Sequence, residues 1–73
     1  MRLHEIITVM VRLDNLIRMK ATGSPDQLAA RLNVSRTTIH RYLNELRNFG
    51  APIKYCRYRN SYYYEEEFQL KFI

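Results

Sequence analysis

Two sequence signals for a helix N-terminus lie so close together in this chain that they predict two helices joined by a tight turn. The first is Ser24–Gln27, where serine can cap the helix, proline suits its first position and glutamine can return a hydrogen bond to the cap. Residues 28–32 supply a buried side, and Asn33 can then turn the chain in the left-handed region. Ser35 follows as the cap of the next helix. Helices joined by a turn of about three to four residues cross at a large angle, so the second one projects from the pair.

The second helix of the pair is predicted over Arg36–Asn48. Gly50 stands where a helix terminator belongs, and Pro52 prevents the helix from resuming. At about 100° per residue, one side collects the apolar residues Ile39, Leu43 and Leu46, with Tyr42 at its edge. The opposite side collects Thr37, Arg41, Asn44 and Asn48, flanked by Thr38 and His40. This helix therefore carries a polar side that a small core does not need.

A further helix is predicted over Arg2–Lys20, before this pair. Its apolar residues Leu3, Ile6, Met10, Leu13 and Ile17 follow the alternating three- and four-residue spacing of one helical stripe. The stretch Ile6–Val11 is also rich in β-branched residues and is compatible with a strand. We favour the helix, because the longer period continues to Ile17. Ala21–Gly23 is predicted to end it, with Gly23 as the left-handed terminator.

The pattern changes after Pro52 to that of a β-hairpin. Two runs of strand-forming residues, Ile53–Tyr58 and Ser61–Tyr64, are separated by Arg59–Asn60. The alternation over Tyr64–Phe72 is compatible with an extra C-terminal strand. Three helices and a hairpin predict an α+β winged helix-turn-helix. We expect one domain over residues 1–73, with helix 1 and an N-terminal extension over 1–20, the helix pair over 24–48, the wing over 52–64 and a tail over 65–73.

Basic side chains concentrate in the second half of the chain. The whole sequence has 12 lysines and arginines against 7 acidic residues, a net charge of +5. Residues 31–59 contain seven basic side chains and a single acidic one, Glu45, whereas three of the remaining acids stand together at Glu65–Glu67. A basic block of this density points to an anionic partner, with nucleic acid as the first candidate and an anionic membrane surface as the second.

The sequence gives little support to other classes of protein. A single cysteine, Cys56, excludes an internal disulfide framework and a cysteine-rich zinc site, and fits a reducing compartment. His4 and His40 lack acidic or cysteine neighbours, so we expect no metal and no cofactor. No paired carboxylates, phosphate loop or nucleophile with its base is recognisable, so we do not expect an enzyme. No signal peptide or membrane span is visible, and we expect a cytoplasmic protein with no membrane partner.

The stretch Leu28–Leu43, which reads LAARLNVSRTTIHRYL, resembles the DNA-binding domain of bacterial DeoR-like and WYL-domain regulators. It is also similar to the winged domain of the biotin ligase repressor. The resemblance covers Leu16–Tyr64 and includes the later Phe49–Ile53 and Tyr62–Tyr64. The family has glycine where Asn33 stands and a glycine-rich wing turn where this chain has Arg59–Ser61. The family's C-terminal effector domain has no counterpart here, so the resemblance implies a stand-alone reader with no small-molecule effector, which associates with the bacterial nucleoid when bound.

The polar side of the second helix of the pair is the candidate surface for double-stranded DNA. The resemblance implies that Ser35, Arg36, Thr37, Thr38, His40 and Arg41 face DNA. The residues alone add Asn44, which can pair with adenine, and the hairpin's Lys54, Arg57, Arg59 and Asn60. We therefore predict a sequence-specific transcription regulator that reads the major groove with residues 36–48. The alternative is a winged-helix module for protein–protein interaction without specific DNA binding, which docks its partner through helix 1 and the tail.

Apolar residues in excess of the small core lie at both ends of the chain. They are Leu3, Ile6, Ile7 and Met10 in the first helix, and Phe68, Leu70 and Phe72 in the tail. Exposed apolar surface of this size on a small chain marks an interface, so we predict a homodimer through these residues. The competing interpretation is that the tail covers the first helix within one chain.

Overall fold

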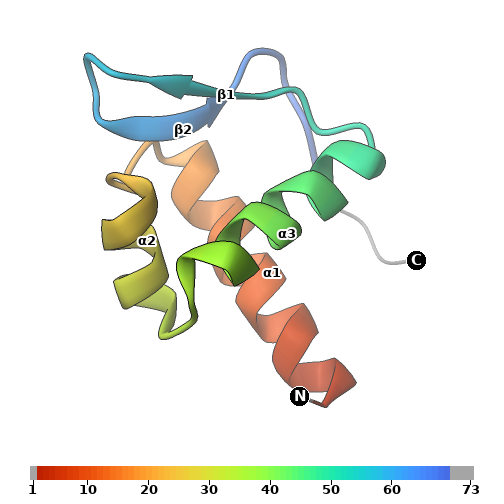
Figure 1. The fold of residues 1–73 in the computed structure, drawn as a ribbon. Coiled ribbons are helices and arrows are strands. Elements are labelled where there is room, and N and C mark those ends of the chain that lie inside the picture. The colour runs from red at the N-terminus through yellow and green to blue at the C-terminus, as the bar shows by residue number, and fades with distance from the viewer. Residues whose placement is uncertain (1, 70–73) are drawn as a thin grey trace.

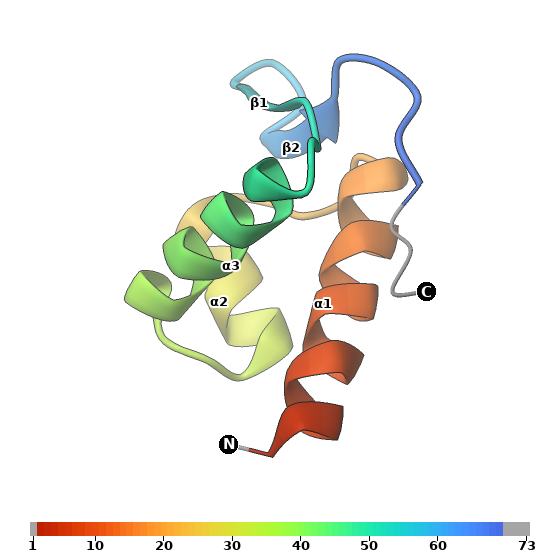
Figure 2. The ribbon, with the colours of Figure 1, turned by 90° about the vertical axis from the view of Figure 1, so that its right-hand side faces the viewer.

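The computed structural model describes residues 2–69, in which three helices precede two strands. The elements are α1 (Leu3–Arg18), α2 (Pro25–Leu32), α3 (Arg36–Asn48), β1 (Ile53–Cys56) and β2 (Ser61–Tyr64). The strands pair as an antiparallel hairpin that crosses one end of the helices (Figure 1). The view in Figure 2 places α3 and α1 on opposite sides of the molecule. This is the α+β winged helix that the sequence predicted.

The first helix confirms the helical interpretation of residues 6–11 but ends differently from the prediction. The left-handed residue at its end is Lys20, with a φ of 56°. The N–H of Lys20 donates to the carbonyl of Ile17 and the N–H of Ala21 to the carbonyl of Leu16, at 3.0 and 2.9 Å. These two bonds form a Schellman motif, so the helix is already closed before Gly23. Gly23 is also left-handed (φ 74°), but it serves the turn into α2.

The tight pair α2 and α3 forms as the local signals predicted. Ser24 and Gln27 exchange the two hydrogen bonds of a capping box, and Asn33 takes the left-handed conformation with a φ of 56°. Ser35 then caps α3 by accepting from the N–H of Thr38 at 3.1 Å. At the far end of α3, Gly50 is left-handed (φ 99°) and terminates the helix as predicted. Each boundary is therefore satisfied by residues within a few positions of it.

The hairpin has shorter strands and a longer turn than the sequence predicted. The register pairs Ile53 with Tyr64 and ends at Cys56 with Ser61. The four residues between these ends, Arg57–Asn60, form what we call the hairpin turn. Asn60 closes it in the left-handed region at a φ of 52°. Residues 65–69 form no strand, so over the described part of the tail the extra C-terminal strand is absent, and residues 70–73 lie outside the described chain.

The core fills the space where the helices and the hairpin meet. Its completely or almost completely buried side chains are Leu13 and Ile17 of α1, Leu28 of α2, and Ile39, Leu43 and Leu46 of α3. Tyr42, which the pattern placed at the edge of this set, is also buried. From the hairpin, Ile53 and Tyr62 complete the core. All the buried positions of α3 lie on one side of it, so the opposite side is left to solvent.

Polar contacts fix the hairpin to the first helix and to the turn after it. Tyr64 donates from its hydroxyl to Asp14 at 2.6 Å, and Arg18 donates to the same carboxylate at 2.9 and 3.2 Å. Thr22 and Ser61, both almost fully buried, join the turn between α1 and α2 to the start of β2. Because these contacts hold β2 at two points, the orientation of the hairpin relative to the helices is defined by tertiary structure.

Candidate nucleic-acid interface

The exposed side of α3 is the centre of the candidate interface. Its outermost line, which we call the crest, carries Thr37, Arg41, Asn44 and Asn48, all exposed. The core contacts of α3 come from the opposite side of the helix. Within residues 2–69, the side chains of Thr37, His40 and Arg41 make no hydrogen bond or ion pair. These three side chains therefore stand free of the rest of their own chain, which is the geometry that entry into a groove requires.

The first turn of α3 uses part of its polar set to close the helix. The Ser35 hydroxyl accepts from the Thr38 N–H and donates to the Thr38 hydroxyl at 2.9 Å. Arg36 forms a long ion pair of 3.5 Å with Asp26 at the start of α2, and both side chains remain mostly exposed. An exposed pair at this distance is weak, so Arg36 stays available to an anion. Ser35 and Thr38, in contrast, already have partners within the cap.

One edge of α3 faces the hairpin. Arg47 donates to the side-chain oxygen of Asn44 at 3.2 Å and to the carbonyl of Ile53 at 3.5 Å. It therefore contacts both the crest and the first residue of β1. At about 100° per residue, Arg36 and His40 lie along this same edge. Three basic or polar side chains thus line the border between α3 and the hairpin.

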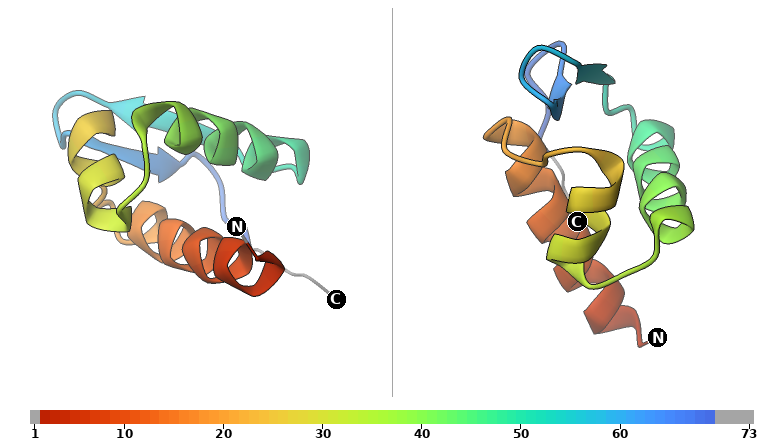
Figure 3. Two further views of the ribbon diagram at one scale, coloured as in Figure 1. Left: turned by 60° about the horizontal axis from the view of Figure 1, so that its bottom comes forward. Right: turned by 60° about the vertical axis from the view of Figure 1, so that its left-hand side comes forward.

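The hairpin turn exposes two arginines and a tyrosine. Arg57 and Arg59 are exposed, and Tyr58 between them is completely exposed, at 101%. The turn lies beside α2 in the left view of Figure 3, and its residue Asn60 contacts Gln27 in the first turn of α2. Asn60, which the sequence placed at the tip as a DNA contact, has its side chain directed to its own chain: it donates to the Gln27 side-chain oxygen at 3.0 Å and accepts from the Tyr55 hydroxyl.

Lys54 has an acidic neighbour. Its amino group lies 3.9 Å from a carboxylate oxygen of Glu65, and both side chains are more than 45% exposed. Glu65 is the first of the three consecutive glutamates after β2. The pair reduces the positive charge at this end of β1, so the free cations of the hairpin are those of its turn.

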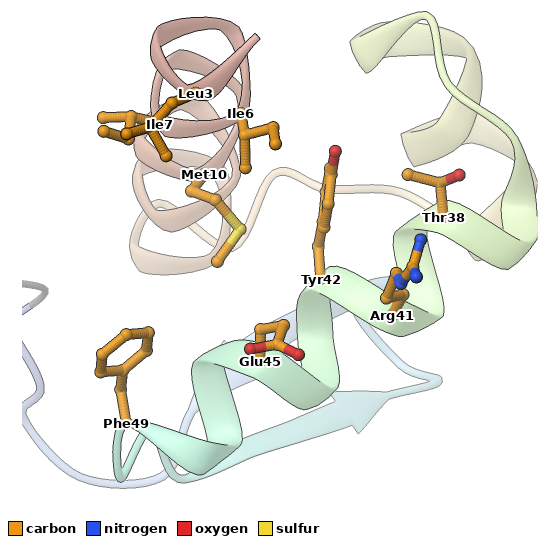
Figure 4. A pocket seen from close by; sticks show the side chains of 9 residues that line it. All are labelled: Leu3, Ile6, Ile7, Met10, Thr38, Arg41, Tyr42, Glu45 and Phe49. Carbon is orange, nitrogen blue, oxygen red and sulfur yellow. The ribbon is translucent and has the colours of Figure 1, made fainter. Parts of the chain in front are cut away.

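A groove of about 620 Å³ separates the first half of α1 from α3 (Figure 4). It is lined by Leu3, Ile6, Ile7 and Met10 of α1, Thr38, Arg41, Tyr42 and Glu45 of α3, and Phe49 just after α3. In Figure 4, Thr38 and Arg41 occupy one end, while Phe49 and the α1 residues Leu3 and Ile7 lie toward the other. One end of the groove therefore borders the crest, and the other end is apolar.

The residues predicted for a dimer interface have different environments. Leu3 is 73% exposed, Ile6 and Ile7 are half-buried, and Met10 belongs to the core at 5%. Phe68 of the tail is half-buried and packs against Tyr64, with ring centroids 5.1 Å apart. The predicted residues Leu70 and Phe72 lie outside the described residues. The tail thus contacts its own chain at Phe68, whereas the first turns of α1 offer the exposed apolar surface.

Two tyrosines of β2 titrate outside their ordinary range. Burial raises the pKa of Tyr62, opposed in part by the positive charge of Arg47. Burial also raises the pKa of Tyr64, and its hydrogen bond to the Asp14 carboxylate raises that pKa further. Both phenols therefore keep their protons to a higher pH than an ordinary tyrosine does. Among residues 2–69, no cluster of three or more histidine, cysteine or acidic side chains is suited to a metal ion. Over the same residues, no helix is both long and apolar enough to span a membrane.

The sequence analysis did not assign three residues to this surface. Arg47 lies two turns beyond His40 on the hairpin edge, and the helical period of α3 would have predicted this position. Tyr58 was predicted only as the last residue of a strand, because strand formers surround it. Gln27 was recognised as a capping residue, but its contact with Asn60 spans 33 residues of sequence and has no local signal.

An exposed polar helix, preceded by a short helix across a tight turn and followed by a basic hairpin, defines a winged helix-turn-helix protein. A family model described as "HTH domain" matches residues 12–64, well over half of the chain. The chain therefore belongs to the helix-turn-helix DNA-binding domains found in DeoR- and WYL-type regulators. No significant similarity to a curated protein or to a solved structure was found.

Proposed function

We propose that this protein binds double-stranded DNA at a specific sequence, with α3 in the major groove, and regulates transcription. The observation that carries the proposal is the exposed crest of α3, where Thr37, Arg41 and Asn44 lie on the side opposite the core. The major groove is about 12 Å wide and admits one helix. Arginine can bond guanine through two donors, asparagine can pair with adenine, and threonine can contact the thymine methyl group.

The contacts around the crest suit the DNA backbone. The N-terminus of α3, with its cap at Ser35, favours a phosphate because its first N–H groups point outward. Arg36 extends this positive edge toward the hairpin, and His40 adds a polar side chain beside it. Arg57 and Arg59 of the hairpin turn add two exposed cations, and Lys54 a weaker one because of Glu65. In this arrangement, phosphate contacts orient the protein and the crest reads the bases.

We further propose that two copies bind together as a homodimer. Residues 3–11 of α1 precede the matched family region, and Leu3 in them is 73% exposed. With Ile7 and Phe49, it forms the apolar end of the groove, away from Arg41. A second copy docked at this end would leave the crest open. A two-fold dimer would present two recognition helices about one DNA turn, roughly 34 Å, apart and select a palindrome. We place this regulator in the bacterial cytoplasm, associated with the nucleoid when bound.

The proposal is tested by selecting bound duplexes from a random pool and then titrating the selected site. We expect a palindromic consensus, and affinity for the selected duplex well above that for a random duplex at two salt concentrations. Equal affinity for both duplexes, at both concentrations, would overturn sequence-specific recognition. It would favour the alternative function, a module that binds another protein, because non-specific attraction to DNA is expected of any chain of this charge.

A further inference from the structure

We infer that Asn60 is a positioning residue of the hairpin turn, which acts in DNA binding through its neighbours instead of by touching DNA. The inference rests on the proposed function and deepens it. It departs from the sequence-based prediction, which treated Asn60 as a contact at the tip of the wing. The structure shows three features that together assign this role: the backbone conformation of Asn60, the partners of its amide, and the exposure of the residues before it.

The backbone of Asn60 explains why the turn needs a special residue, but not why that residue is asparagine. Its φ of 52° lies in the left-handed region, which glycine adopts freely and asparagine adopts at small cost. A requirement for left-handed backbone alone would be met at least as well by glycine, so the side-chain amide needs a separate explanation.

The Asn60 amide links the turn to both neighbouring elements. Its nitrogen donates to the side-chain oxygen of Gln27 at 3.0 Å, and its oxygen accepts from the Tyr55 hydroxyl. The same Gln27 oxygen accepts from the N–H of Ser24 at 2.8 Å, and the Gln27 N–H donates to the Ser24 hydroxyl at 3.2 Å. Gln27 is thus held by the capping box of α2. One continuous chain of hydrogen bonds therefore joins β1, the turn and the first turn of α2.

The residues that this chain of bonds orients are the free cations of the hairpin. Within the described chain, the side chains of Arg57, Tyr58 and Arg59 have no hydrogen bond, ion pair or ring contact. Tyr58 is completely exposed, so nothing in the core holds this segment. A mobile turn would lose conformational freedom when it binds, which weakens binding, whereas a turn already tied to α2 loses less. Asn60 therefore preorganises the two arginines relative to α2, and through it relative to α3.

The first test uses the free protein. The substitution Asn60→Gly retains a residue suited to the left-handed conformation and removes only the amide. In ¹⁵N relaxation measurements, we expect increased fast motion at residues 57–59 with the helices unchanged. The matched control is Gln27→Glu, which retains the capping box and an oxygen acceptor for Asn60, and should leave the turn ordered. Unchanged order in Asn60→Gly would overturn the inference, and this result does not depend on DNA binding.

The second test measures affinity for the selected duplex over a range of salt concentrations. Asn60→Gly should weaken binding several-fold and reduce the slope of log affinity against log salt by about 0.9 for each phosphate that the arginines no longer neutralise. A residue that only stabilised the fold would leave this slope unchanged. Combining Asn60→Gly with Arg57→Ala and Arg59→Ala should cost less than the sum of the separate effects, because the amide acts through these arginines. Additive effects would show that Asn60 contacts DNA itself and would overturn the inference.

The two tests also separate this inference from the proposed function. If the unmodified chain binds selected and random duplexes equally, the proposed function fails, and the relaxation comparison alone still supports or overturns the link between Asn60 and the turn. If the unmodified chain is specific and Asn60→Gly matches it in affinity and in salt slope, the proposed function stands and the inference is wrong.

Discussion

The hydroxyl oxygens of Thr22 and Ser61 lie 3.1 Å apart, and both residues are almost completely buried. The Ser61 oxygen also accepts from the backbone N–H of Thr22 at 3.0 Å, and the Thr22 oxygen accepts from the N–H of Tyr62 at 2.9 Å. This small buried network satisfies two backbone donors that water cannot reach. It is the point at which the hairpin is joined to the turn before α2.

The first prediction concerns this network. Ser61→Ala leaves the buried N–H of Thr22 without its acceptor, and such a change costs about 1–3 kcal/mol of unfolding free energy. Denaturation by urea should show that decrease. The control Thr22→Ser retains the hydroxyl and should be destabilised less. Equal stability of Ser61→Ala and the unmodified protein would contradict the structural role of the pair.

The second prediction concerns base recognition by Arg41. Arg41→Ala should weaken binding to the selected duplex by about 1–3 kcal/mol if the guanidinium contacts a base. Arg41→Lys is the informative companion, because it retains the charge and removes the two-donor fork that bonds guanine. We expect the lysine variant to retain the salt slope and to discriminate poorly at one base pair, as measured by titrating single-base variants of the site. Full discrimination by Arg41→Lys would assign Arg41 to phosphate contact.

The third prediction concerns the cations of the hairpin turn. Arg57→Ala or Arg59→Ala should weaken binding to selected and random duplexes alike, because phosphate contacts carry no sequence information. Each should reduce the salt slope by about 0.9. Arg12→Ala removes the same charge from α1, where the guanidinium donates to the carbonyl of Arg31 at 3.3 Å, and should change the slope less. An unaltered salt slope in both hairpin variants would remove the wing from the interface.

The fourth prediction concerns stability at alkaline pH. The pKa of Tyr64 is raised in the folded state by burial and by the Asp14 hydrogen bond, so the folded protein holds this proton more tightly than the unfolded chain does. The resulting stabilisation is fully present below the unfolded pKa, near 10, and is lost as the pH rises above that value. Tyr64→Phe should lower stability at neutral pH by about 0.5–1.5 kcal/mol and weaken the alkaline decline. Unfolding curves between neutral and strongly alkaline pH measure both effects. An alkaline decline equally steep in the variant would show that other groups cause it.

The fifth prediction concerns the proposed dimer. Leu3→Glu places a charge at the exposed apolar end of the groove and should shift the mass measured by light scattering from dimer to monomer. Val11→Glu is the matched control, since Val11 is on the same helix, is 41% exposed and does not line the groove. A monomeric mass for the unmodified protein at micromolar concentration would refute the interface.

The helix boundaries were largely predictable because their causes are local. Ser24, Asn33 and Ser35 act on backbone groups within a few residues, so the capping box, the sharp turn and the start of α3 follow from sequence pattern. The end of α1 was predicted wrongly. Glycine is the usual left-handed residue, yet Lys20 takes that conformation because the two closing hydrogen bonds offset its smaller intrinsic preference.

The arrangement of the hairpin was less predictable. The strand-forming run through Tyr58 predicted long strands and a two-residue turn. The only local signal for the left-handed backbone at residue 60 is that asparagine accepts this conformation more readily than most residues. Its partner Gln27 lies in a different element, and no periodicity relates the two residues. Likewise, nothing near Thr22 in the sequence indicates that its partner is Ser61.

The sequence alone determined three helices, a hairpin and a polar, basic side on α3. These features are local, because periodicity and capping depend on neighbours along the backbone. Folding in three dimensions settled which polar side chains remain free for a partner. It left Thr37 and Arg41 exposed, paired Lys54 with Glu65 and turned Asn60 toward α2. Those outcomes depend on distances between residues far apart in the chain, and such distances exist only after the core around Leu13, Leu28 and Leu43 has packed.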